Sequence, residues 1–324
     1  MAVIEIPKEK WSGKVREVTL GATAAQGGTR SRTVTVGGET TLPFLHFEGD
    51  IPHPPAIAVE VQDRPPADWP AILLEAWREA VQDVAAWAKA VEDLGADLVA
   101  LKFTAHPDLN AAYARQTLRR VLGATGLPLL VYGPGQAELD NEVLVAVAEE
   151  GEGENLALGV CEEKNYRTIV AAALAHGHLV MSRTPMDVNL AKQLIILISD
   201  MSMPLTRILM DPTTGALGYG MEYGYSVMER LRLAALQGDS MTQQPMIVTP
   251  GEEAWRTKEA RAGAGVPAAW GDWAERAIHW EVLTASTLIH AGADVVVLRH
   301  PESVRRIRRM IAALMGNGQI NLRY

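Results

Sequence analysis

The most constraining feature of this sequence is a repeated alternation of short β-branched runs with longer stretches of helical periodicity, which begins near residue 56. Short runs rich in Val, Ile and Leu are typical of buried strands, whereas apolar residues three and four positions apart indicate helices. Helical crossovers of this length join parallel strands. The strand patterns are AIAVEVQD (56–63), DLVALKF (97–103), PLLVYG (128–133), LALGVC (156–161), HLVMSRT (178–184), RILMD (207–211), PMIVT (245–249) and DVVVLRH (294–300).

Strand–helix units repeated over residues 56–315 match the size of a (β/α)₈ barrel, which is typically about 250 residues long. We therefore predict an α/β fold of the TIM-barrel type. The alternative is an open doubly wound sheet, which more often stops at about five or six strands. Residues 1–55 carry two further strand patterns, KVREVTLGA and RTVTVGG, and predict a β-hairpin extension packed on one end of the barrel. Residues 316–324 are expected to form a short C-terminal tail.

The alternation within the first two strands predicts which side chains point into the barrel. Glu60 and Lys102 alternate with larger apolar residues, so both are expected inside, on neighbouring strands. A buried lysine beside a carboxylate most often forms a charge pair. The alternative is a lysine whose pKa is lowered and which forms a Schiff base, as an aldolase would use.

Function on this fold lies on the loops that follow the strands, because these loops converge on one mouth. The stretch 207–236 places Asp211 and a series of glycines between a strand and a helix. Glycines allow a backbone or ligand to approach closely, and the N–H groups at a helix start attract oxygen atoms. Asp211 could instead cap its own Asp-Pro turn. GxxxxGK[ST] is absent and GxGxxG does not follow the first strand, so a nucleotide site is not indicated.

The helix that follows this loop has a clear apolar periodicity. Val227, Met228 and Leu231 recur at helical spacing, whereas Arg232 and its charged neighbours are expected on the solvent side.

The predicted mouth also collects polar residues from other strand ends and a long loop. The polar residues are Asp63, Arg64, Tyr132, Glu162, Glu163, Asn165, Arg183, Asp187 and Asp211. The loop after the seventh strand carries Trp255, Trp270 and Trp273. These tryptophans either form a ligand or partner surface or pack the loop onto the barrel.

Composition excludes several classes of function. Cys161 is the only cysteine, so the chain has no internal disulfide and cannot supply the cysteine set of an iron–sulfur cluster. A net charge of −9 argues against nucleic-acid binding. The histidines show no ligand spacing, so no metal site is predicted. No membrane span or signal peptide is indicated, and we expect a cytoplasmic protein.

Several long motifs resemble one family. VTLGATAAQGGTRSRTVTVGGETTLPFLHFEG, AIAVEVQD, ILMDPTTGALGYGMEYGYSVMERLRLAALQGD and EAWRTKEA are similar to the small (delta) subunit of the corrinoid/iron–sulfur protein. That protein serves the acetyl-CoA synthase and carbon monoxide dehydrogenase system of the acetyl-CoA pathway. The resemblance covers nearly the whole chain and implies a (β/α)₈ barrel, in agreement with the strand pattern.

The resemblance also implies partners and a cofactor. The small subunit of this family pairs with a large (gamma) subunit, which carries the iron–sulfur cluster and holds cobalamin against the barrel mouth. The cobalt accepts a methyl group from methyltetrahydrofolate through a methyltransferase and delivers it to acetyl-CoA synthase. The predicted mouth residues include no convincing nucleophile–base pair, so we expect a supporting subunit without catalytic residues. The residues expected nearest the corrinoid are Asp211, Gly218, Tyr219, Gly220, Tyr223 and Arg183.

A stand-alone enzyme remains the alternative. Barrels that transfer a methyl group from methyltetrahydrofolate are structural relatives of this family. Asp63 and Asn165 at strand ends could hold the amide and amine edges of a pterin.

Overall fold

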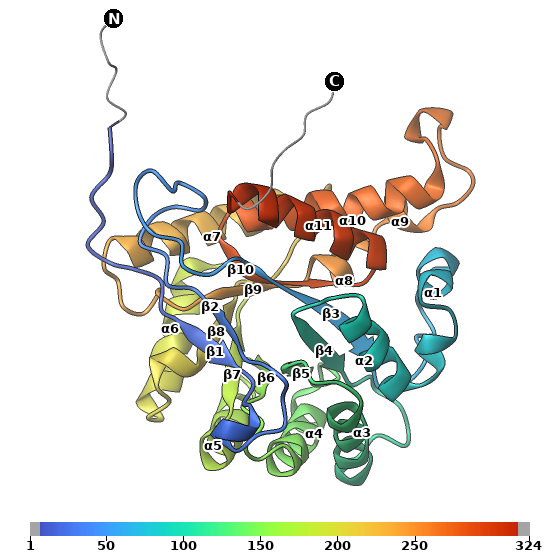
Figure 1. Cartoon of the computed structure of the whole chain (residues 1–324), viewed down its shortest axis with the longest axis horizontal. Coiled ribbons are helices and arrows are strands. Elements are labelled where there is room, and N and C mark those ends of the chain that lie inside the picture. Colours follow the sequence, from blue (N-terminus) through green and yellow to red (C-terminus); the bar gives the residue numbers. More distant parts are fainter. Residues whose placement is uncertain (1–6, 317–324) are drawn as a thin grey trace, which may run out of the picture.

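The computed structural model describes residues 7–316 and contains a closed barrel of parallel strands, in the ring order β10-β3-β4-β5-β6-β7-β8-β9. Helices surround the barrel (Figure 1). The strands are β3 (Ala56–Gln62), β4 (Leu98–Lys102), β5 (Leu129–Tyr132), β6 (Ala157–Cys161), β7 (Leu179–Arg183), β8 (Ile208–Asp211), β9 (Met246–Val248) and β10 (Ala293–Leu298). The predicted (β/α)₈ barrel is confirmed, and each predicted strand lies within two residues of its observed bounds.

The helices follow the strands in the expected alternation. They are α1 (Ala71–Trp77), α2 (Val84–Asp93), α3 (Ala111–Ala124), α4 (Ala137–Glu150), α5 (Tyr166–His176), α6 (Val188–Asp200), α7 (Met221–Leu236), α8 (Pro250–Ala254), α9 (Lys258–Arg261), α10 (Trp273–His290) and α11 (Pro301–Leu314). Short 3₁₀ helices occupy Ala24–Gln26, Arg78–Gln82, Leu205–Arg207 and Ala268–Trp270. Among residues 7–316, no helix is both long and apolar enough to cross a membrane.

The core has two layers that the strand alternation predicts. Val59 and Leu101 belong to the layer between the strands and the helices, whereas Ala58 and Leu98 belong to the layer inside the barrel. Glu60 is buried and Lys102 is mostly buried, and both share the inward parity of the second layer. The predicted interior position of these two charged residues is therefore confirmed.

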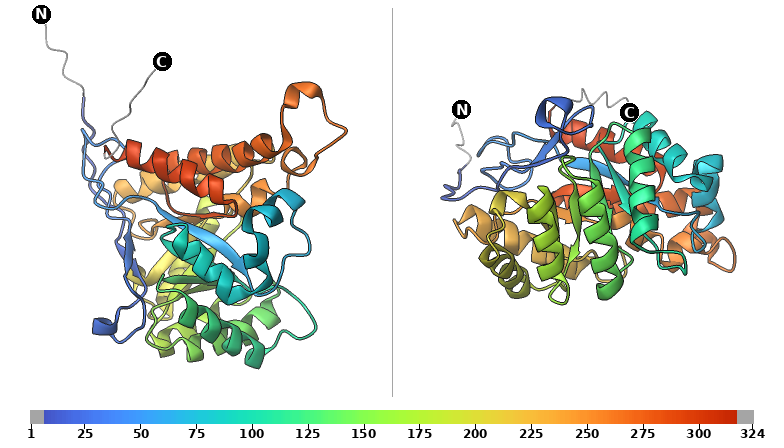
Figure 2. Two further views of the ribbon diagram at one scale, coloured as in Figure 1. Left: turned by 45° about the vertical axis from the view of Figure 1, so that its right-hand side comes forward. Right: turned by 90° about the horizontal axis from the view of Figure 1, so that it is seen from below.

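The N-terminal segment forms the predicted hairpin and closes one end of the barrel. β1 (Val18–Leu20) pairs antiparallel with β2 (Val34–Val36). Val18, Leu20 and Val36 are buried in the same cluster as the inward-facing side chains of the barrel. Figure 2 shows this blue segment at one end of the molecule and the orange segment around α9 at the other. The hairpin thus seals the end opposite the mouth.

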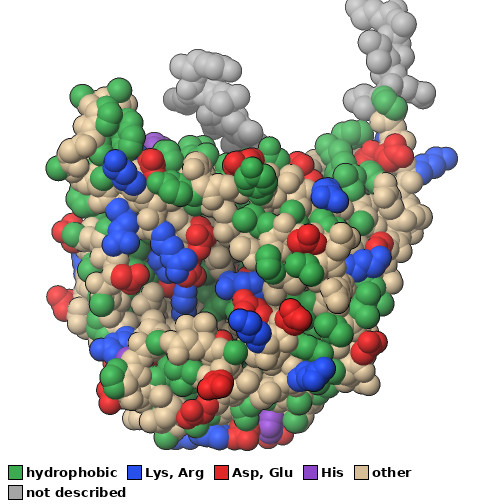
Figure 3. Space-filling model, turned by 180° about the vertical axis from the view of Figure 1, so that it is seen from behind, with side chains coloured by type: hydrophobic (Ala, Val, Ile, Leu, Met, Phe, Trp, Pro, Cys, Tyr) green, Lys and Arg blue, Asp and Glu red, His purple; other side chains and the backbone are tan. Residues whose placement is uncertain are grey.

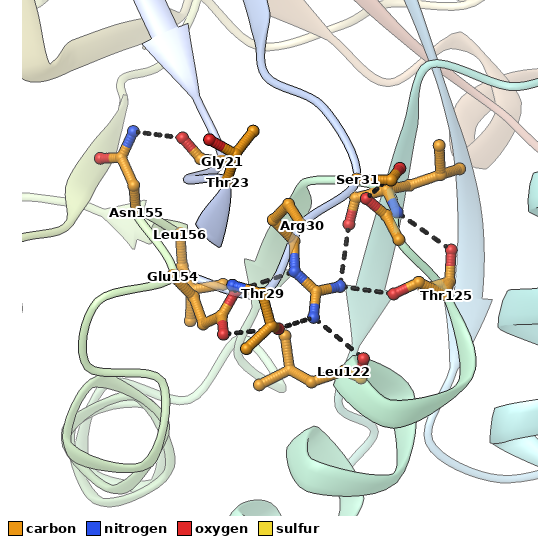
Figure 4. Close-up of polar contacts among 12 residues, drawn as sticks. Gly21, Thr23, Thr29, Arg30, Ser31, Leu122, Thr125, Glu154, Asn155 and Leu156 are labelled. Carbon is orange, nitrogen blue, oxygen red and sulfur yellow. Dashed lines mark hydrogen bonds and ion pairs between the residues drawn. The ribbon is translucent and has the colours of Figure 1, made fainter. Parts of the chain in front are cut away.

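A buried arginine anchors the hairpin loop to the barrel (Figure 4). Arg30 Nε donates to Glu154 Oε2 at 2.8 Å, and its terminal nitrogens donate to the carbonyl oxygens of Leu122, Thr125 and Leu127. Thr29 also donates to Glu154, from both its backbone N–H and its hydroxyl. All described donors of this guanidinium are therefore satisfied inside the protein.

One helix-face prediction is wrong. Arg232 of α7 is buried rather than solvent-exposed, and it donates to Asp294 Oδ2 at 2.8 Å and to Glu39 Oε2 at 3.2 Å. The two carboxylates come from β10 and from residues 37–55 between β2 and β3, here called the lead-in segment, so local periodicity alone could not place this side chain. The predicted tail at 316–324 lies outside the described residues apart from Gly316.

Candidate functional site

Two adjoining cavities open at the carboxyl end of the barrel strands. The inner cavity, of about 280 Å³, is lined by Lys102, Tyr132, Arg183, Thr213 and Glu252 among others. The outer cavity, of about 600 Å³, lies between the loop after β6 and helix α6. Arg183 and Thr213 line both cavities, so these two residues mark their junction. The face seen from behind in Figure 3 is hollowed near its centre, with Lys and Arg side chains beside Asp and Glu.

The junction is built on an ion pair between the ends of two neighbouring strands. Arg183 ends β7 and Asp211 ends β8, and the strand register places them side by side. Arg183 Nε donates to Asp211 Oδ2 at 2.8 Å. Burial acts to lower the pKa of Arg183, but the attraction of Asp211 outweighs it and raises the pKa overall. The guanidinium therefore stays charged and fixed in orientation.

Asp211 also has the turn-capping role that its Asp-Pro context suggested. Its Oδ1 accepts from the backbone N–H of Thr213 at 2.9 Å. One carboxylate oxygen thus fixes the turn after β8 while the other holds Arg183. Asp211 therefore caps its turn, as the first alternative predicted, and also lies at the cavity junction through its pair with Arg183.

The glycine-rich loop lies on the rim rather than in the cavities. Gly218 and Gly220 have φ values of 77° and 94°, in the left-handed region that favours glycine. Tyr219 and Tyr223 are 56% and 66% exposed. The loop is fastened to α10 by the Trp280 indole, which donates to the carbonyl of Leu217 at 3.0 Å. The predicted site residues therefore form two groups: Asp211 and Arg183 at the cavity junction, and the other four on the rim.

Lys102 is ion-paired, but with a different carboxylate from the one expected. Its Nζ lies 2.7 Å from Glu252 Oε2, whereas Glu60 makes a bidentate pair with Arg299 at 2.8 Å. Burial acts to raise the pKa of Glu252, but the attraction of Lys102 and Arg299 outweighs it and lowers the pKa to about 2. An amine held in an ion pair with a carboxylate is not free to attack a carbonyl.

The two residues considered for pterin recognition are already engaged. Asp63 Oδ1 accepts from the N–H and hydroxyl of Thr104, and its Oδ2 lies 3.1 Å from His106 Nε2. Asn165 accepts from the N–H of Glu162 and donates to the carbonyl of Val160. Asp63 therefore ties the end of β3 to the loop after β4, and Asn165 holds the loop after its own strand, β6.

The tryptophans of the long loop after β9 mainly pack that loop onto the barrel. Trp255 is buried and its indole donates to Glu281 at 2.9 Å. Trp273 donates to the carbonyl of Ala260, and Trp270 lies under the Arg276 guanidinium. The packing alternative therefore accounts for their contacts.

Sequence reasoning missed two hydroxyl groups at the site. Tyr132 was counted among the mouth residues but not among the binding candidates, and Thr184 is the last residue of the predicted strand 178–184. Both hydroxyls are buried and lack a hydrogen-bond partner in the described part of the chain. Their position at strand ends was the available signal, but an unpaired hydroxyl is visible only in three dimensions.

The described residues contain no group of three or more His, Cys, Asp or Glu side chains that could hold a metal ion. Cys161 is buried, and burial raises the pKa of its thiol far above the usual range. This thiol is therefore protonated and sequestered from a reacting partner.

The barrel fold of this chain is shared with dihydropteroate synthases of known structure. The enzyme from Thermus thermophilus matches with a TM-score of 0.55 and 15% identity, over 85% of this chain and 99% of that one. The Xanthomonas albilineans enzyme, in complex with indole-2-carboxylic acid and 6-chloroguanine, matches with a TM-score of 0.54 and 14% identity, over 82% and 94%. At this identity the likeness establishes the fold alone.

Sequence comparison then gives the particular family. The family model for the CO dehydrogenase/acetyl-CoA synthase delta subunit matches residues 17–312. Acetyl-CoA decarbonylase/synthase complex subunit delta from Archaeoglobus fulgidus is 39% identical over 97% of this chain and 72% of its own length. The subunit delta of Methanopyrus kandleri is 38% identical over 90% and 73%. The chain belongs to the CO dehydrogenase/acetyl-CoA synthase delta subunit family, which confirms the resemblance inferred from its motifs.

Proposed function

We propose that this chain is the small subunit of a heterodimeric corrinoid/iron–sulfur methyl carrier. In this proposal the barrel mouth covers the cobalamin held by a large (gamma) subunit. The complex moves a methyl group from methyltetrahydrofolate, through a methyltransferase, to acetyl-CoA synthase. The observation that carries the proposal is membership of the delta subunit family over residues 17–312.

The chemistry of the mouth supports a covering rather than a catalytic role. Lys102 and Arg183 each lie in an ion pair with a buried or mostly buried carboxylate. The thiol of Cys161 is buried and protonated. The described mouth thus presents no activated nucleophile beside a general base. When bound, the cobalt would supply the methyl-accepting centre, and this chain would exclude water and provide a docking face.

The rim has the character of a contact surface for a flat or apolar partner. Tyr219 and Tyr223 are exposed aromatic side chains, and Met186 and Leu190 beside the outer cavity are 38% and 44% exposed. Aromatic side chains and methionine are enriched in protein interfaces. These residues fit a role in holding a corrinoid-bearing domain over the mouth.

The first test is an anaerobic pull-down of the tagged chain from its own host, with cobalt, iron and protein quantified in the eluate. Recovery of a second, cysteine-rich chain with about one cobalt per pair supports the proposal, following the cysteine ligation of iron–sulfur clusters. A chain recovered alone and without cobalt contradicts it.

Rim variants then test the placement. Replacing Tyr219 and Tyr223 together by Ala should reduce retention of cobalt and slow methylation of the complex. Phe47, which is 45% exposed on the lead-in segment, gives the matched control Phe47→Ala. The rim glycines are poor targets, because any side chain at Gly218 or Gly220 strains a backbone with positive φ.

The stand-alone alternatives make different predictions. A pterin-dependent methyltransferase requires that the isolated chain bind methyltetrahydrofolate, measurable by calorimetry. Asp63 and Asn165 would have to exchange their present hydrogen bonds for that binding. A Schiff-base aldolase requires a borohydride-trapped adduct on Lys102, which its ion pair with Glu252 disfavours.

A further inference from the structure

Arg183 is held by one nitrogen and leaves two unused. Its Nε donates to Asp211, while neither terminal nitrogen has a hydrogen-bond or ion-pair partner within residues 7–316. The side chain is 27% exposed and lines both cavities. An arginine fixed in this way presents its planar fork of donors to whatever enters the junction.

Two unpaired hydroxyls accompany this fork. Tyr132 lines the inner cavity and Thr184 lines the outer cavity, and both hydroxyl oxygens are buried without a partner in the described structure. Buried polar groups usually have a hydrogen-bond partner, so these two hydroxyls beside one cavity junction are available to a ligand. Burial, reinforced by the negative charge of Asp211, raises the pKa of Tyr132 well above its usual value. Its hydroxyl therefore remains a donor.

The charges around the junction decide which kind of acceptor fits. Five carboxylates oppose four cations at the two cavities, if Asp211 is counted with the lining residues. They are Glu162, Glu163, Glu252, Glu253 and Asp211, against Lys102, Lys164, Arg183 and Arg256. The positive charge of Arg183 is already balanced by Asp211, so an entering carboxylate or phosphate would add to an excess of negative charge. The site lacks hydrogen-bond acceptors rather than negative charge.

The outer cavity indicates where the rest of such a ligand lies. Leu190, Leu194 and Leu197 of α6 line it together with Pro185. Cavities of this kind combine an apolar wall with a few polar groups that fix orientation. A ligand that places its acceptor at Arg183 would lay an apolar or flat body along α6.

We infer that Arg183, Tyr132 and Thr184 form a subsite for a neutral carboxamide or lactam group at the junction of the two cavities. The carbonyl oxygen of that group accepts from the terminal nitrogens of Arg183. Two sources have this chemistry: the carboxamides at the edge of a corrin ring and the lactam of a pterin. If the group is a corrin carboxamide, the inference rests on the proposed function and extends it. If the group is a pterin lactam, the inference does not depend on the proposed function.

The subsite is tested on the isolated full-length chain with benzamide and benzoate, which share a ring and differ in the charge of the head group. Titration followed by NMR chemical shifts gives both dissociation constants. Benzamide should bind at least about tenfold more tightly, a difference of about one hydrogen bond. Arg183→Lys and Tyr132→Phe should each weaken benzamide by about threefold to tenfold. Equal binding of benzoate, or benzamide binding insensitive to both variants, overturns the inference.

Arg207 provides a matched control. It directly precedes β8, and its guanidinium donates to the carbonyls of Gly177 and His178 directly before β7, away from the mouth. Arg207→Lys therefore makes the same exchange outside the proposed subsite. This variant should leave benzamide binding unchanged, and a loss as large as that of Arg183→Lys contradicts a local subsite.

Two larger ligands distinguish the sources. Weakened binding of cobinamide by the Arg183→Lys complex, with methyltetrahydrofolate unaffected, assigns the subsite to a corrin carboxamide. The opposite pattern assigns it to a pterin lactam, and no change with either ligand overturns the inference. The outcome is separate from the pull-down, because the benzamide titration needs neither a partner chain nor cobalt.

Discussion

From the buried Arg30–Glu154 pair we predict that Arg30, in the loop of the N-terminal hairpin, contributes a large share of the stability of the barrel. The guanidinium is fully buried and makes its ion pair at 2.8 Å. Replacing Arg30 by Met keeps much of the volume but removes every donor, as the contacts in Figure 4 indicate. The carbonyl oxygens of Leu122 and Thr125 then lose their arginine donor, and the Glu154 carboxylate loses its cation.

The expected cost follows from these contacts. Removing one partner of a buried ion pair costs about 3–5 kcal/mol, because the remaining charge stays buried. Glu154 retains two hydrogen bonds from Thr29, which lowers this cost. The carbonyls left without a donor raise it again, by about 1 kcal/mol or more each. We therefore expect Arg30→Met to lower the free energy of unfolding by about 3–5 kcal/mol.

Urea unfolding followed by circular dichroism measures this difference. Arg32 is a matched control, because its side chain is 49% exposed and lies 4.0 Å from Asp97. Arg32→Met should cost less than about 1 kcal/mol, as is usual for exposed pairs. Equal effects of the two substitutions would refute the argument that burial and partner loss, rather than charge alone, determine the stability here.

Three further predictions concern buried titratable groups. Tyr132→Phe should not lower the free energy of unfolding in urea and could raise it by up to about 1 kcal/mol, because the hydroxyl removed is buried without a partner in the described residues. Burial lowers the pKa values of His178 and His300 to about 4, so the unfolded chain binds protons first. The contribution of each histidine to the free energy of unfolding should therefore be fully present above about pH 6.5 and fall by roughly 3 kcal/mol towards pH 4. Urea titrations at several pH values measure this loss, and a free energy of unfolding that does not change with pH would contradict it. Lys102→Met should raise the pKa of Glu252 from about 2, measured by NMR titration of its carboxyl carbon, and an unchanged pKa would show that Lys102 is not its main partner.

The fold was predictable because the apolar sequence of each barrel strand reflects its burial on both faces. A strand covered by helices on one side and packed on the barrel interior on the other is apolar on both faces. The eight runs therefore stood out against the helical stretches between them. Inward parity also placed Glu60 and Lys102 correctly, since alternation is a property of the backbone and needs no knowledge of partners.

The ion-pair partners were not predictable, because they lie on elements that are distant in sequence and meet only in the folded protein. Lys102 pairs with Glu252, which lies on α8 after β9, a strand that does not neighbour β4 in the ring. Arg232 shows the same limit, because its carboxylates lie on β10 and on the lead-in segment. Periodicity reports whether a position is inside or outside, but the choice among buried carboxylates depends on how loops fold over the mouth.

The division of the candidate site into a junction and a rim follows from the same distinction. Asp211 and Arg183 end neighbouring parallel strands, so the register brings them together whatever the loops do. Gly218, Tyr219 and Gly220 belong to a loop whose position depends on Trp280 of α10, far later in the chain, and Tyr223 lies in the first turn of α7. Tyr219 and Tyr223 are exposed, where a partner can reach them, while Arg183 lines the cavities. In the proposed complex, a corrinoid-bearing partner would meet the rim first, and only its smallest polar groups would reach the junction.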